Sequence, residues 1–230
     1  MKNIVVLTGA GISAESGLAT FRASNGLWNN YSIYEVATPE AWNNNKQLVL
    51  DFYNFRRKEL QKVKPNSAHL SLAELQNHFH VEIITQNVDN LHEQAGSKNV
   101  LHLHGLLTQA KGEFSHTPIM DIEYQDIKLG DLTPSGEQMR PHVVWFGEDV
   151  PLIEDAHEKC QKADILIIIG TSLQVYPAAG LIHAVPPSCQ IFLIDPHADE
   201  IDVPHHIKLF KEKASDKVPK LIQQLLNSKQ

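Results

Sequence analysis

The chain has 230 residues, of which 42% are hydrophobic and 20% charged, and its net charge is −7. This length can bury a large core, and it suits one α/β domain with a small appended lobe. The negative charge argues against a nucleic-acid-binding protein, no apolar run is long enough to span a membrane, and the two isolated cysteines, Cys160 and Cys189, favour a reducing cytoplasm.

The first predicted element is a buried strand over residues 4–7, a short apolar run rich in β-branched residues. It starts so early that we expect no signal or transit peptide before it. Gly9, Gly11 and Ala14 then form a G-x-G-x-x-A pattern, in which missing side chains let backbone N–H groups approach a pyrophosphate. The same spacing also occurs in strand-turn-helix units that need glycines only for their turn.

The segment after this turn differs from that of a dehydrogenase, which would place a second strand and an acidic residue about 20 positions further on. Residues 20–28 instead form a polar, glycine-bearing loop that contains Arg22 and two aromatic residues, Phe21 and Trp28. The first turn therefore indicates a nucleotide site and the loop indicates a flap over it, which argues against simple hydride transfer.

Residues 33–80 are predicted to be mostly helical. One helix begins at Pro39, an apolar stripe near Phe55 marks a second over 46–63, and a third follows over 68–79. The other predicted elements are strands over 81–85, 100–104, 143–146, 165–169, 190–194 and 207–210, and helices over 152–162 and 215–226. Strands that alternate with helices in this way predict an α/β fold with a doubly wound parallel sheet.

Residues 107–139 are the least regular part of the sequence, because they are polar, contain glycine and proline and carry little core material. His116, Asp121 and Glu123 are residue types that bind metals, but their spacing fits no familiar site. We expect this region to be a metal-free lobe held together by apolar contacts from Phe114, Ile119, Ile122 and Tyr124.

Several blocks, in order along the chain, resemble the sirtuin family, the NAD-dependent protein-lysine deacylases. They cover residues 9–17, 20–22, 26–28, 85–92, 102–105, 140–148 and 170–178. The resemblance is to class III sirtuins of the bacterial desuccinylase/deacetylase type, which fits a chain with almost no terminal extensions. It implies one catalytic domain over 1–230, with a large Rossmann-like lobe (1–32, 80–106, 140–230) and a small, mostly helical lobe (33–79, 107–139).

The resemblance fails in one respect, because most sirtuins hold zinc in the 107–139 region with two cysteine pairs. This sequence has no cysteine before position 160, so a tetra-thiolate site cannot form there. We therefore expect a metal-free remnant of the zinc module and no zinc in the protein.

The resemblance implies NAD as the cofactor. Within its site, Arg22 meets the pyrophosphate, Phe21 shields the reacting centre from water, Thr171 and Ser172 reach the other phosphate or ribose, and Asp195 accepts from the adenosine ribose. The full set of cofactor-binding residues that the resemblance assigns is Gly9, Ala10, Gly11, Ser13, Glu15, Thr20, Phe21, Arg22, Trp28, Gln86, Asn87, Asp89, His104, Gly170, Thr171, Ser172 and Asp195.

Catalysis is assigned to His104 and Asn87. In a sirtuin-like reaction the acyl oxygen of an acyl-lysine attacks the nicotinamide ribose, and a base then relays a proton from the ribose hydroxyls. Histidine suits that task because its pKa of about 6.5 lies near working pH. His102, two residues earlier in a strand, would point to the opposite face. A purely structural His104 is the alternative.

Gln86, Asn87 and Asp89 are assigned to the nicotinamide and ribose pocket, since amide groups at a strand end can bond a carboxamide and hydroxyls. Asn87 or Asp89 as a helix N-cap is the alternative, and both roles can hold together.

Two segments, 144–148 and 173–176, resemble the edges between which sirtuins lay the substrate peptide. An extended peptide can pair its backbone between two such edges with little demand on its side chains. A plain core strand is the alternative for 143–146. The assigned residues are Val144, Phe146, Gly147, Glu148, Val175 and Tyr176.

Ala37, Tyr53 and Arg56 resemble the acyl pocket of class III sirtuins, which remove succinyl, malonyl or glutaryl groups. Tyr53 and Arg56 are three residues apart on a predicted helix, so they share a face, and a phenol with a guanidinium makes a carboxylate receptor. The alternative is that Tyr53 packs in the core and Arg56 belongs to a solvated run with Arg57 and Lys58.

The sequence therefore predicts an NAD-dependent protein-lysine deacylase that removes succinyl or malonyl as well as acetyl groups. Its products would be nicotinamide, deacylated lysine and 2′-O-acyl-ADP-ribose, and its partners acylated lysine side chains of proteins. We expect a cytoplasmic monomer that binds neither nucleic acid nor membrane. An NAD-consuming ADP-ribosyltransferase or NAD glycohydrolase is the alternative, and a non-catalytic nucleotide-binding module is a third.

Overall fold

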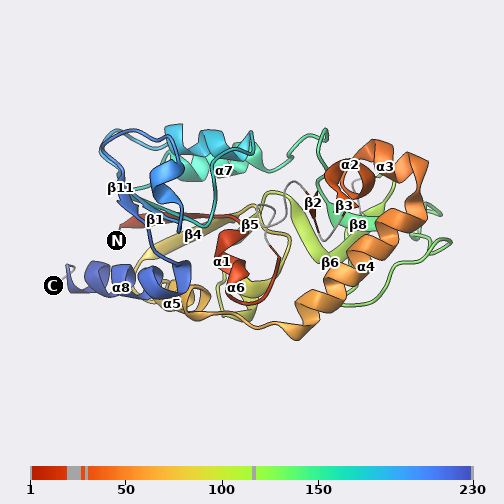
Figure 1. Ribbon diagram of the computed structural model, residues 1–230, viewed down its shortest axis with the longest axis horizontal. Coiled ribbons are helices and arrows are strands. Elements are labelled where there is room, and N and C mark those ends of the chain that lie inside the picture. Colours follow the sequence, from red (N-terminus) through yellow and green to blue (C-terminus); the bar gives the residue numbers. More distant parts are fainter. Residues whose placement is uncertain (1, 20–26, 29–30, 116–117, 229–230) are drawn as a thin grey trace.

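The computed structural model describes residues 2–19, 27–28, 31–115 and 118–228, which form a large lobe and a small lobe side by side (Figure 1). A parallel sheet with the strand order β11-β10-β9-β1-β4-β5 organises the large lobe. Its strands are β1 (Asn3–Thr8), β4 (His80–Thr85), β5 (Val100–His102), β9 (Ile165–Ile169), β10 (Gln190–Ile194) and β11 (Lys208–Phe210). Because the chain extends the sheet from β1 first to one side and then to the other, the sheet is doubly wound, as predicted.

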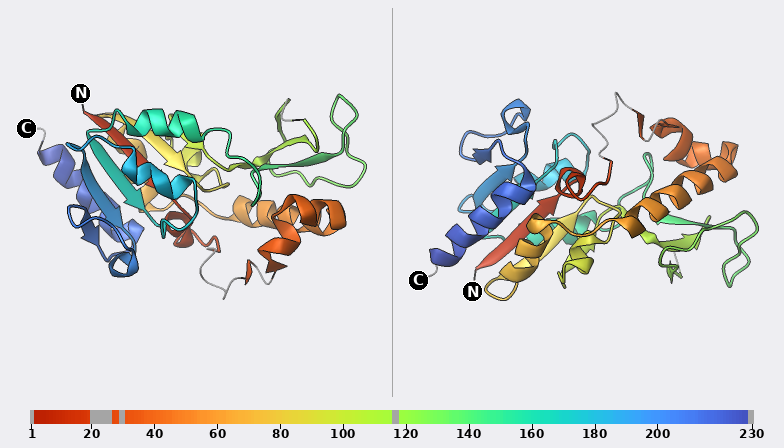
Figure 2. Two further views of the ribbon diagram at one scale, coloured as in Figure 1. Left: turned by 90° about the horizontal axis from the view of Figure 1, so that it is seen from above. Right: turned by 60° about the horizontal axis from the view of Figure 1, so that its bottom comes forward.

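Helices cover both faces of this sheet, as Figure 2 shows, and its central strands are therefore apolar on both sides. Ile4 of β1 belongs to one core and Val5 to the other, and every residue of β9 is buried. One face carries α1 (Gly11–Ala14), α5 (Ser67–Leu75) and α8 (Ala214–Asn227). The other carries α7 (Ile153–Cys160) and the short 3-10 helices η1 (Ala178–His183) and η2 (Ala198–Glu200).

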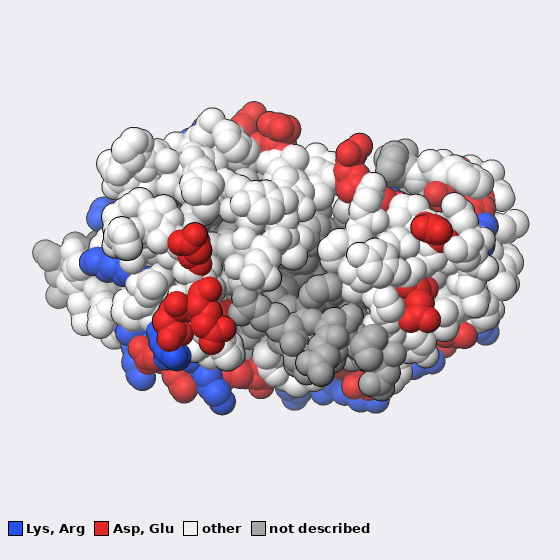
Figure 3. Space-filling view, turned by 45° about the horizontal axis from the view of Figure 1, so that its top comes forward, with Lys and Arg blue, Asp and Glu red and all other residues white. Residues whose placement is uncertain are grey.

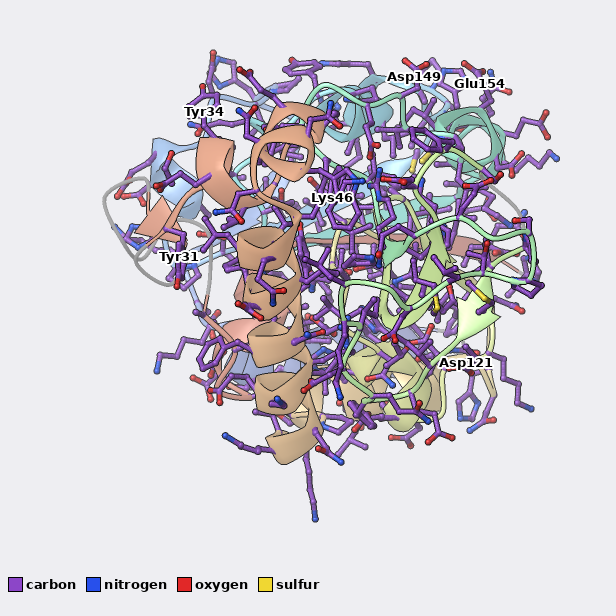
Figure 4. The ribbon with its side chains drawn as sticks, turned by 90° about the vertical axis from the view of Figure 1, so that its right-hand side faces the viewer. Tyr31, Tyr34, Lys46, Asp121, Asp149 and Glu154 are labelled. Carbon is purple, nitrogen blue, oxygen red and sulfur yellow. The ribbon has the colours of Figure 1, made fainter. Side chains whose placement is uncertain are left out.

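The small lobe combines helices with an antiparallel sheet of strand order β7-β6-β8. Figure 4, which faces this lobe, shows Lys46 at the start of α4 and Asp121 of β7 on the other side. The helices are α2 (Ile33–Val36), α3 (Pro39–Asn44) and α4 (Lys46–Lys62), and the strands are β6 (Gly105–Gly112), β7 (Met120–Asp121) and β8 (Met139–Val143). The remaining elements are β2 (Leu27–Trp28), β3 (Tyr31–Ser32) and α6 (Leu91–Gln94).

Residues 107–139 contain more regular structure than the sequence predicts. β6 is buried along most of its length, and Leu107 and Ala110 join the apolar residues of α4 in a third core. The prediction of little core material was wrong because polar residues such as Thr108 and Gln109 break the apolar alternation of this strand. The strand predicted over 143–146 ends at Val143 in the structure, since the chain there leaves the sheet.

Of the four residues predicted to hold residues 107–139 together by apolar contacts, two lie in the core and two do not. Ile122 is buried and Tyr124 packs against the third core, but Phe114 and Ile119 are 81% and 46% exposed. Phe55, predicted near the apolar stripe of α4, is also exposed. The division into lobes differs at α5 as well, because that helix packs on α8 and the parallel sheet and so belongs with the large lobe.

Two polar side chains tie α4 to the interior of the small lobe. Arg57 is fully buried, and its Nε and Nη1 donate to the carbonyl oxygens of Gln125 at 2.9 Å and Leu107 at 3.0 Å. Asn54 Nδ2 donates to the carbonyl oxygen of Ile127 at 2.8 Å, and its Oδ1 accepts from the Ile127 N–H at 2.9 Å. The middle residue of the basic run on α4 therefore points into the lobe, and the predicted alternative of a solvated run is wrong for it.

On the face shown in Figure 3, basic side chains lie toward the margins and form no continuous basic surface. Within residues 2–19, 27–28, 31–115 and 118–228, no three His, Cys, Asp or Glu side chains are grouped so that they could hold a metal ion. His116, one of the metal-binding types noted in the sequence, lies outside these residues. No helix in this part of the chain is long and apolar enough to cross a membrane.

Candidate active site

A cavity of about 710 Å³ lies at the carboxyl ends of β1, β4, β9 and β10 and is bordered by residues of both lobes. β1 pairs with β4 on one side and with β9 on the other, so the direction in which the sheet grows reverses at this point. In open α/β sheets, ligands bind in the crevice at such a topological switch point. The position of the cavity therefore makes it the candidate ligand site of the fold.

The glycines of the first turn have no room for side chains. A Cβ atom on Gly9 would lie 2.7 Å from the carbonyl oxygen of Gly170, and one on Gly11 would lie 2.6 Å from the Gly170 Cα. Gly170 itself has a φ of +62°, which favours glycine. The glycines are therefore required because the two turns approach each other closely, and the same turns also border the cavity.

A hydrogen-bond network fixes the polar residues after β4. Asn87 Nδ2 donates to the Gly9 carbonyl oxygen at 3.1 Å and to Ser13 Oγ at 3.2 Å, and Ser13 Oγ donates to Asp89 Oδ2 at 3.0 Å. Asp89 Oδ1 accepts from the Leu91 N–H at 3.1 Å, but the N-cap of α6 is Asn90, so neither Asn87 nor Asp89 has the N-cap position given as their alternative. Burial raises the pKa of the Asp89 carboxyl. The amide and carboxyl groups are thus held at the cavity wall.

His104 follows β5 and is held by the backbone. Its Nδ1 lies 2.9 Å from the carbonyl oxygen of Gln86, and burial lowers the pKa of its ring. His102 does not border the cavity, and its two ring nitrogens lie 3.0 Å from the Asn87 carbonyl oxygen and 2.7 Å from Glu93 Oε1. The two histidines therefore have different surroundings, and of the two only His104 borders the cavity.

The other end of the cavity is formed by residues after β9 and β10. Thr171, Ser172 and Asp195 border it, and Thr171 Oγ1 accepts from Gln86 Nε2 at 3.2 Å. Asp195 Oδ1 accepts from the His197 N–H at 2.8 Å, which closes the turn after β10 and holds the carboxylate in place. Polar groups therefore lie at both ends of the cavity.

Two predicted site residues border the cavity but direct their carboxylates to protein groups. Glu15 Oε1 accepts from the Ser215 N–H at 3.3 Å, at the start of α8. Glu148 accepts from Arg140 at 2.7 and 3.1 Å through its two oxygens, and from the Trp145 N–H at 2.8 Å. Both carboxylates therefore accept hydrogen bonds from other parts of the protein and stabilise the fold.

Tyr53 and Arg56 lie one turn apart on α4 and border the cavity together with Ala37. Tyr53 is fully buried, and this burial raises the pKa of its hydroxyl to about 12 although Arg56 favours the ionised form. Burial lowers the pKa of Arg56 to about 10, against the favourable charges of Tyr53 and Asp89. At neutral pH the cavity wall thus holds a neutral phenol and a charged guanidinium.

Trp145 lies within the predicted substrate segment 144–148 but was not itself predicted as a site residue, and it borders the cavity. Its Nε1 donates to Tyr53 Oη at 3.1 Å, and the Arg140 guanidinium lies 3.2 Å from the centre of its ring. One signal for it was available in the sequence: a tryptophan within a predicted binding segment needs an acceptor for its N–H wherever it becomes buried. Other bordering residues that were not predicted include Leu18, Val88, Val143, Pro196 and Lys213.

The predicted site residues converge on this single cavity wherever their side chains are described. Thr20, Phe21 and Arg22 lie outside the described residues, and Trp28 is described only as part of β2. The predicted residues that border the cavity are Gly9, Ala10, Gly11, Ser13, Glu15, Ala37, Tyr53, Arg56, Gln86, Asn87, Asp89, His104, Val144, Phe146, Gly147, Glu148, Gly170, Thr171, Ser172, Val175, Tyr176 and Asp195.

Comparison with known proteins finds matches over nearly the whole chain. Residues 9–177 match the model of the Sir2 family. An NAD-dependent protein deacylase of Bacteroides thetaiotaomicron is 50% identical over 231 residues, which cover 98% of this chain and 99% of the relative. One of Helicobacter pylori is 51% identical over 227 residues, covering 97% of this chain and 99% of the relative.

Solved structures with the same fold include complexes. A Sir2 homologue in complex with NAD superposes with a TM-score of 0.86 at 37% sequence identity, covering 99% of this chain and 90% of that one. A Sir2 protein with a p53 peptide and NAD+ has a TM-score of 0.77 at 26% identity, covering 97% of this chain and 93% of that one. The similarity therefore spans both lobes and the cavity between them.

Proposed function

The chain belongs to the Sir2 family, the sirtuins, and from that premise we propose that it uses NAD to remove acidic acyl groups, succinyl or malonyl, as well as acetyl from protein lysines. The broader activity, NAD-dependent protein deacylation, is that of relatives about half identical over nearly the full chain. The preference for acidic acyl groups rests on residues of this chain. We also propose that the products are nicotinamide, deacylated lysine and 2′-O-acyl-ADP-ribose.

The cavity has the features that an extended dinucleotide requires. Two glycine-containing turns meet at the switch point of the sheet, with polar groups beyond them at both ends. Asn87 and Asp89 would face the nicotinamide and its ribose, and Thr171, Ser172 and Asp195 the other half of the molecule. NAD supplies an electrophilic ribose carbon once its nicotinamide leaves, and the protein has to hold and shield that carbon.

The observation that carries the proposed acyl preference is that Tyr53 and Arg56 border the same cavity as His104 and Asn87. An acidic acyl group ends in a carboxylate, which accepts hydrogen bonds from a neutral phenol and pairs with a guanidinium. Such a charge-assisted pair contributes about 1.5–3 kcal/mol, or about 10- to 150-fold in discrimination. An acetyl group lacks this carboxylate but is small enough to enter the same space.

His104 has the chemistry of a general base in this reaction. The Gln86 carbonyl oxygen can only accept a hydrogen bond, so Nδ1 carries the ring proton and Nε2 is left with a free electron pair. The lowered pKa keeps the ring neutral at working pH. We assign to Nε2 the removal of a proton from a ribose hydroxyl.

The binding place of the substrate peptide, the cellular compartment and the monomeric state are also proposals. Residues 144–148 border the cavity, as do Val175 and Tyr176 of the segment 173–176, and a peptide laid between the two segments would present its acyl-lysine to the cavity. The two cysteines are free and buried, which favours a reducing compartment such as the cytoplasm. Size measurement in solution tests the proposed monomer.

The test is mass-spectrometric deacylation of matched acetyl-lysine and succinyl-lysine peptides, with and without NAD. NAD-dependent removal that favours succinyl supports the proposal in full. Equal or acetyl-favoured removal would leave the deacylase and reject the acidic preference. If neither peptide reacts while NAD is still consumed, the protein is an NAD glycohydrolase or an ADP-ribosyltransferase instead.

A further inference from the structure

We propose that Trp145 determines the preference for acidic acyl groups by fixing the direction in which the Tyr53 hydroxyl donates its proton. Trp145 acts through Tyr53 and is therefore a positioning residue for substrate selection. This inference rests on the proposed acidic-acyl activity, and it adds to Tyr53 and Arg56 a third residue, on a different segment of the chain, that the activity requires.

The geometry between the two side chains allows one arrangement of protons. An indole N–H can only donate, so the Tyr53 oxygen must accept the hydrogen bond from Trp145 Nε1 at 3.1 Å. The hydroxyl then has to point its own proton elsewhere. Among residues 2–19, 27–28, 31–115 and 118–228, Trp145 is the hydrogen-bond partner recorded for this hydroxyl, and both side chains are buried and border the cavity.

A proton directed in this way distinguishes the two kinds of acyl group. The carboxylate of a succinyl or malonyl group can accept it, whereas the methyl group of an acetyl chain cannot. A hydroxyl that accepts one hydrogen bond also donates a stronger one, because the two bonds polarise each other. With a pKa of about 12 the hydroxyl keeps its proton at neutral pH, and Arg56 supplies the positive charge one helical turn away.

Trp145 is itself held too firmly to turn away from Tyr53. Arg140 lies 3.2 Å from the centre of the indole ring, within cation–π distance. The same guanidinium binds both oxygens of Glu148, and Glu148 Oε2 also accepts from the Trp145 backbone N–H at 2.8 Å. Trp42 packs against the ring with a centroid separation of 5.7 Å. The indole N–H is therefore aimed at Tyr53 before any substrate arrives.

The first test is Trp145→Phe, which keeps an aromatic ring for packing but removes the N–H. We expect kcat/KM for a succinyl-lysine peptide to fall about threefold to tenfold more than kcat/KM for the matched acetyl-lysine peptide. Most of the difference should lie in KM, because the contact is made with bound substrate before and during the reaction. The acetyl measurement on the same sample reports whether the variant is folded.

Trp42→Phe is the matched control. Trp42 is buried in the same core and donates its own Nε1–H, to Glu113 Oε2 at 3.1 Å, and it is not among the residues that border the cavity. Loss of that bond should lower stability, but phenylalanine keeps an aromatic ring against Trp145, so the succinyl-to-acetyl ratio should stay within about twofold of wild type. If the removal of any indole N–H from this core altered selectivity, Trp145→Phe and Trp42→Phe would instead change the succinyl-to-acetyl ratio by similar factors.

A double-mutant cycle with Tyr53→Phe decides whether Trp145 acts through Tyr53. In the Tyr53→Phe background, Trp145→Phe should change the ratio by less than about twofold. Replacement of Trp145 by benzothienylalanine, which has sulfur where indole has N–H, provides a second variant of nearly the same shape if Trp145→Phe does not fold. It should reproduce the same loss of selectivity.

The outcomes separate the two proposals. If wild type favours succinyl and both Trp145 variants keep that preference, the inference about Trp145 is wrong and the proposed function stands. The inference also fails if Trp145→Phe lowers the ratio equally with and without the Tyr53 hydroxyl. If wild type shows no preference for succinyl, the acidic-acyl proposal and the inference fail together.

Discussion

The ring Nδ1 of His104 lies 2.9 Å from the backbone carbonyl oxygen of Gln86, and this contact leaves Nε2 without the ring proton. Gln86 also donates to Thr171 through its side chain, so one residue links the proposed base to the turn after β9. The tautomer of His104 is therefore set by a backbone carbonyl oxygen, while burial lowers the pKa of its ring.

His104→Ala should reduce deacylation by at least about 100-fold, since general-base catalysis contributes roughly 10²- to 10⁴-fold. NAD binding, measured by calorimetry, should change little because the other bordering residues remain. Near-normal turnover of the variant would remove His104 from the mechanism.

The pH dependence of kcat/KM should also report His104. The base works when deprotonated, and because burial lowers its pKa, activity should persist below the usual histidine value of about 6.5. An acid limb centred well above that value in the wild type would contradict the assignment of this buried ring as the base.

Arg56→Met should lower kcat/KM for succinyl-lysine peptides about 10-fold or more relative to acetyl-lysine peptides, because it removes the positive charge and keeps an apolar stem of similar length. Lys58→Met is the control, since Lys58 lies on the exposed side of the same helix and pairs with Asp126. Equal losses on both peptides would mean that Arg56 supports the fold.

Arg57→Ala should destabilise the protein by about 3 kcal/mol, as measured by urea unfolding. The substitution leaves the carbonyl oxygens of Leu107 and Gln125 buried without their donor, at about 1–3 kcal/mol for each group. Lys58→Ala, which breaks a surface ion pair, should cost less than about 1 kcal/mol. Similar effects of the two substitutions would show that Arg57 does not organise the small lobe.

Acid should destabilise the fold through His69, which is fully buried on α5 with its ring 4.9 Å from that of His92. Burial lowers the pKa of His69 to about 4, so between pH 6.5 and about 4 the unfolded chain binds a proton that the folded chain does not. Stability therefore falls with decreasing pH in this window, by up to about 1.4 kcal/mol per pH unit for this residue.

His69→Gln should flatten that slope in thermal or urea unfolding measured at several pH values. His206→Gln, at an exposed position, is the matched control and should leave the slope as it is. An unchanged slope in His69→Gln would assign the acid sensitivity elsewhere, for example to His92, whose pKa is also lowered by burial and by His69 and His102.

Local sequence patterns predicted the parallel sheet well because its strands are buried on both faces. A run such as that of β9 has no polar interruption, so its apolar character is visible without knowledge of its neighbours. The antiparallel sheet of the small lobe was missed for the opposite reason. Thr108, Gln109 and Lys111 of β6 obscure its burial, part of which depends on Arg57 from a helix some 50 positions earlier in the chain.

The candidate site was predicted mainly from short blocks with a recognisable family pattern. Those blocks name residues but not their partners, so the sequence could not show that Glu148 is held by Arg140 or that Trp145 donates to Tyr53. Trp145 and Tyr53 are far apart in the sequence, and Arg140 and Glu148 come together only in the folded chain. Position 145 therefore looked like part of a strand, although its side chain borders the cavity.

The close contact between the turns at Gly11 and Gly170 has a consequence for biosynthesis. β1 lies at the centre of the sheet, yet one of its neighbours, β9, leaves the ribosome only after most of the chain has been made. Until then the nascent protein has a central strand with one open, apolar edge and a cavity with one wall missing, and such edges are prone to aggregate. In the proposed nucleotide site, a chain interrupted before Gly170 lacks one wall, so we expect the nucleotide to stabilise only chains that have passed that point.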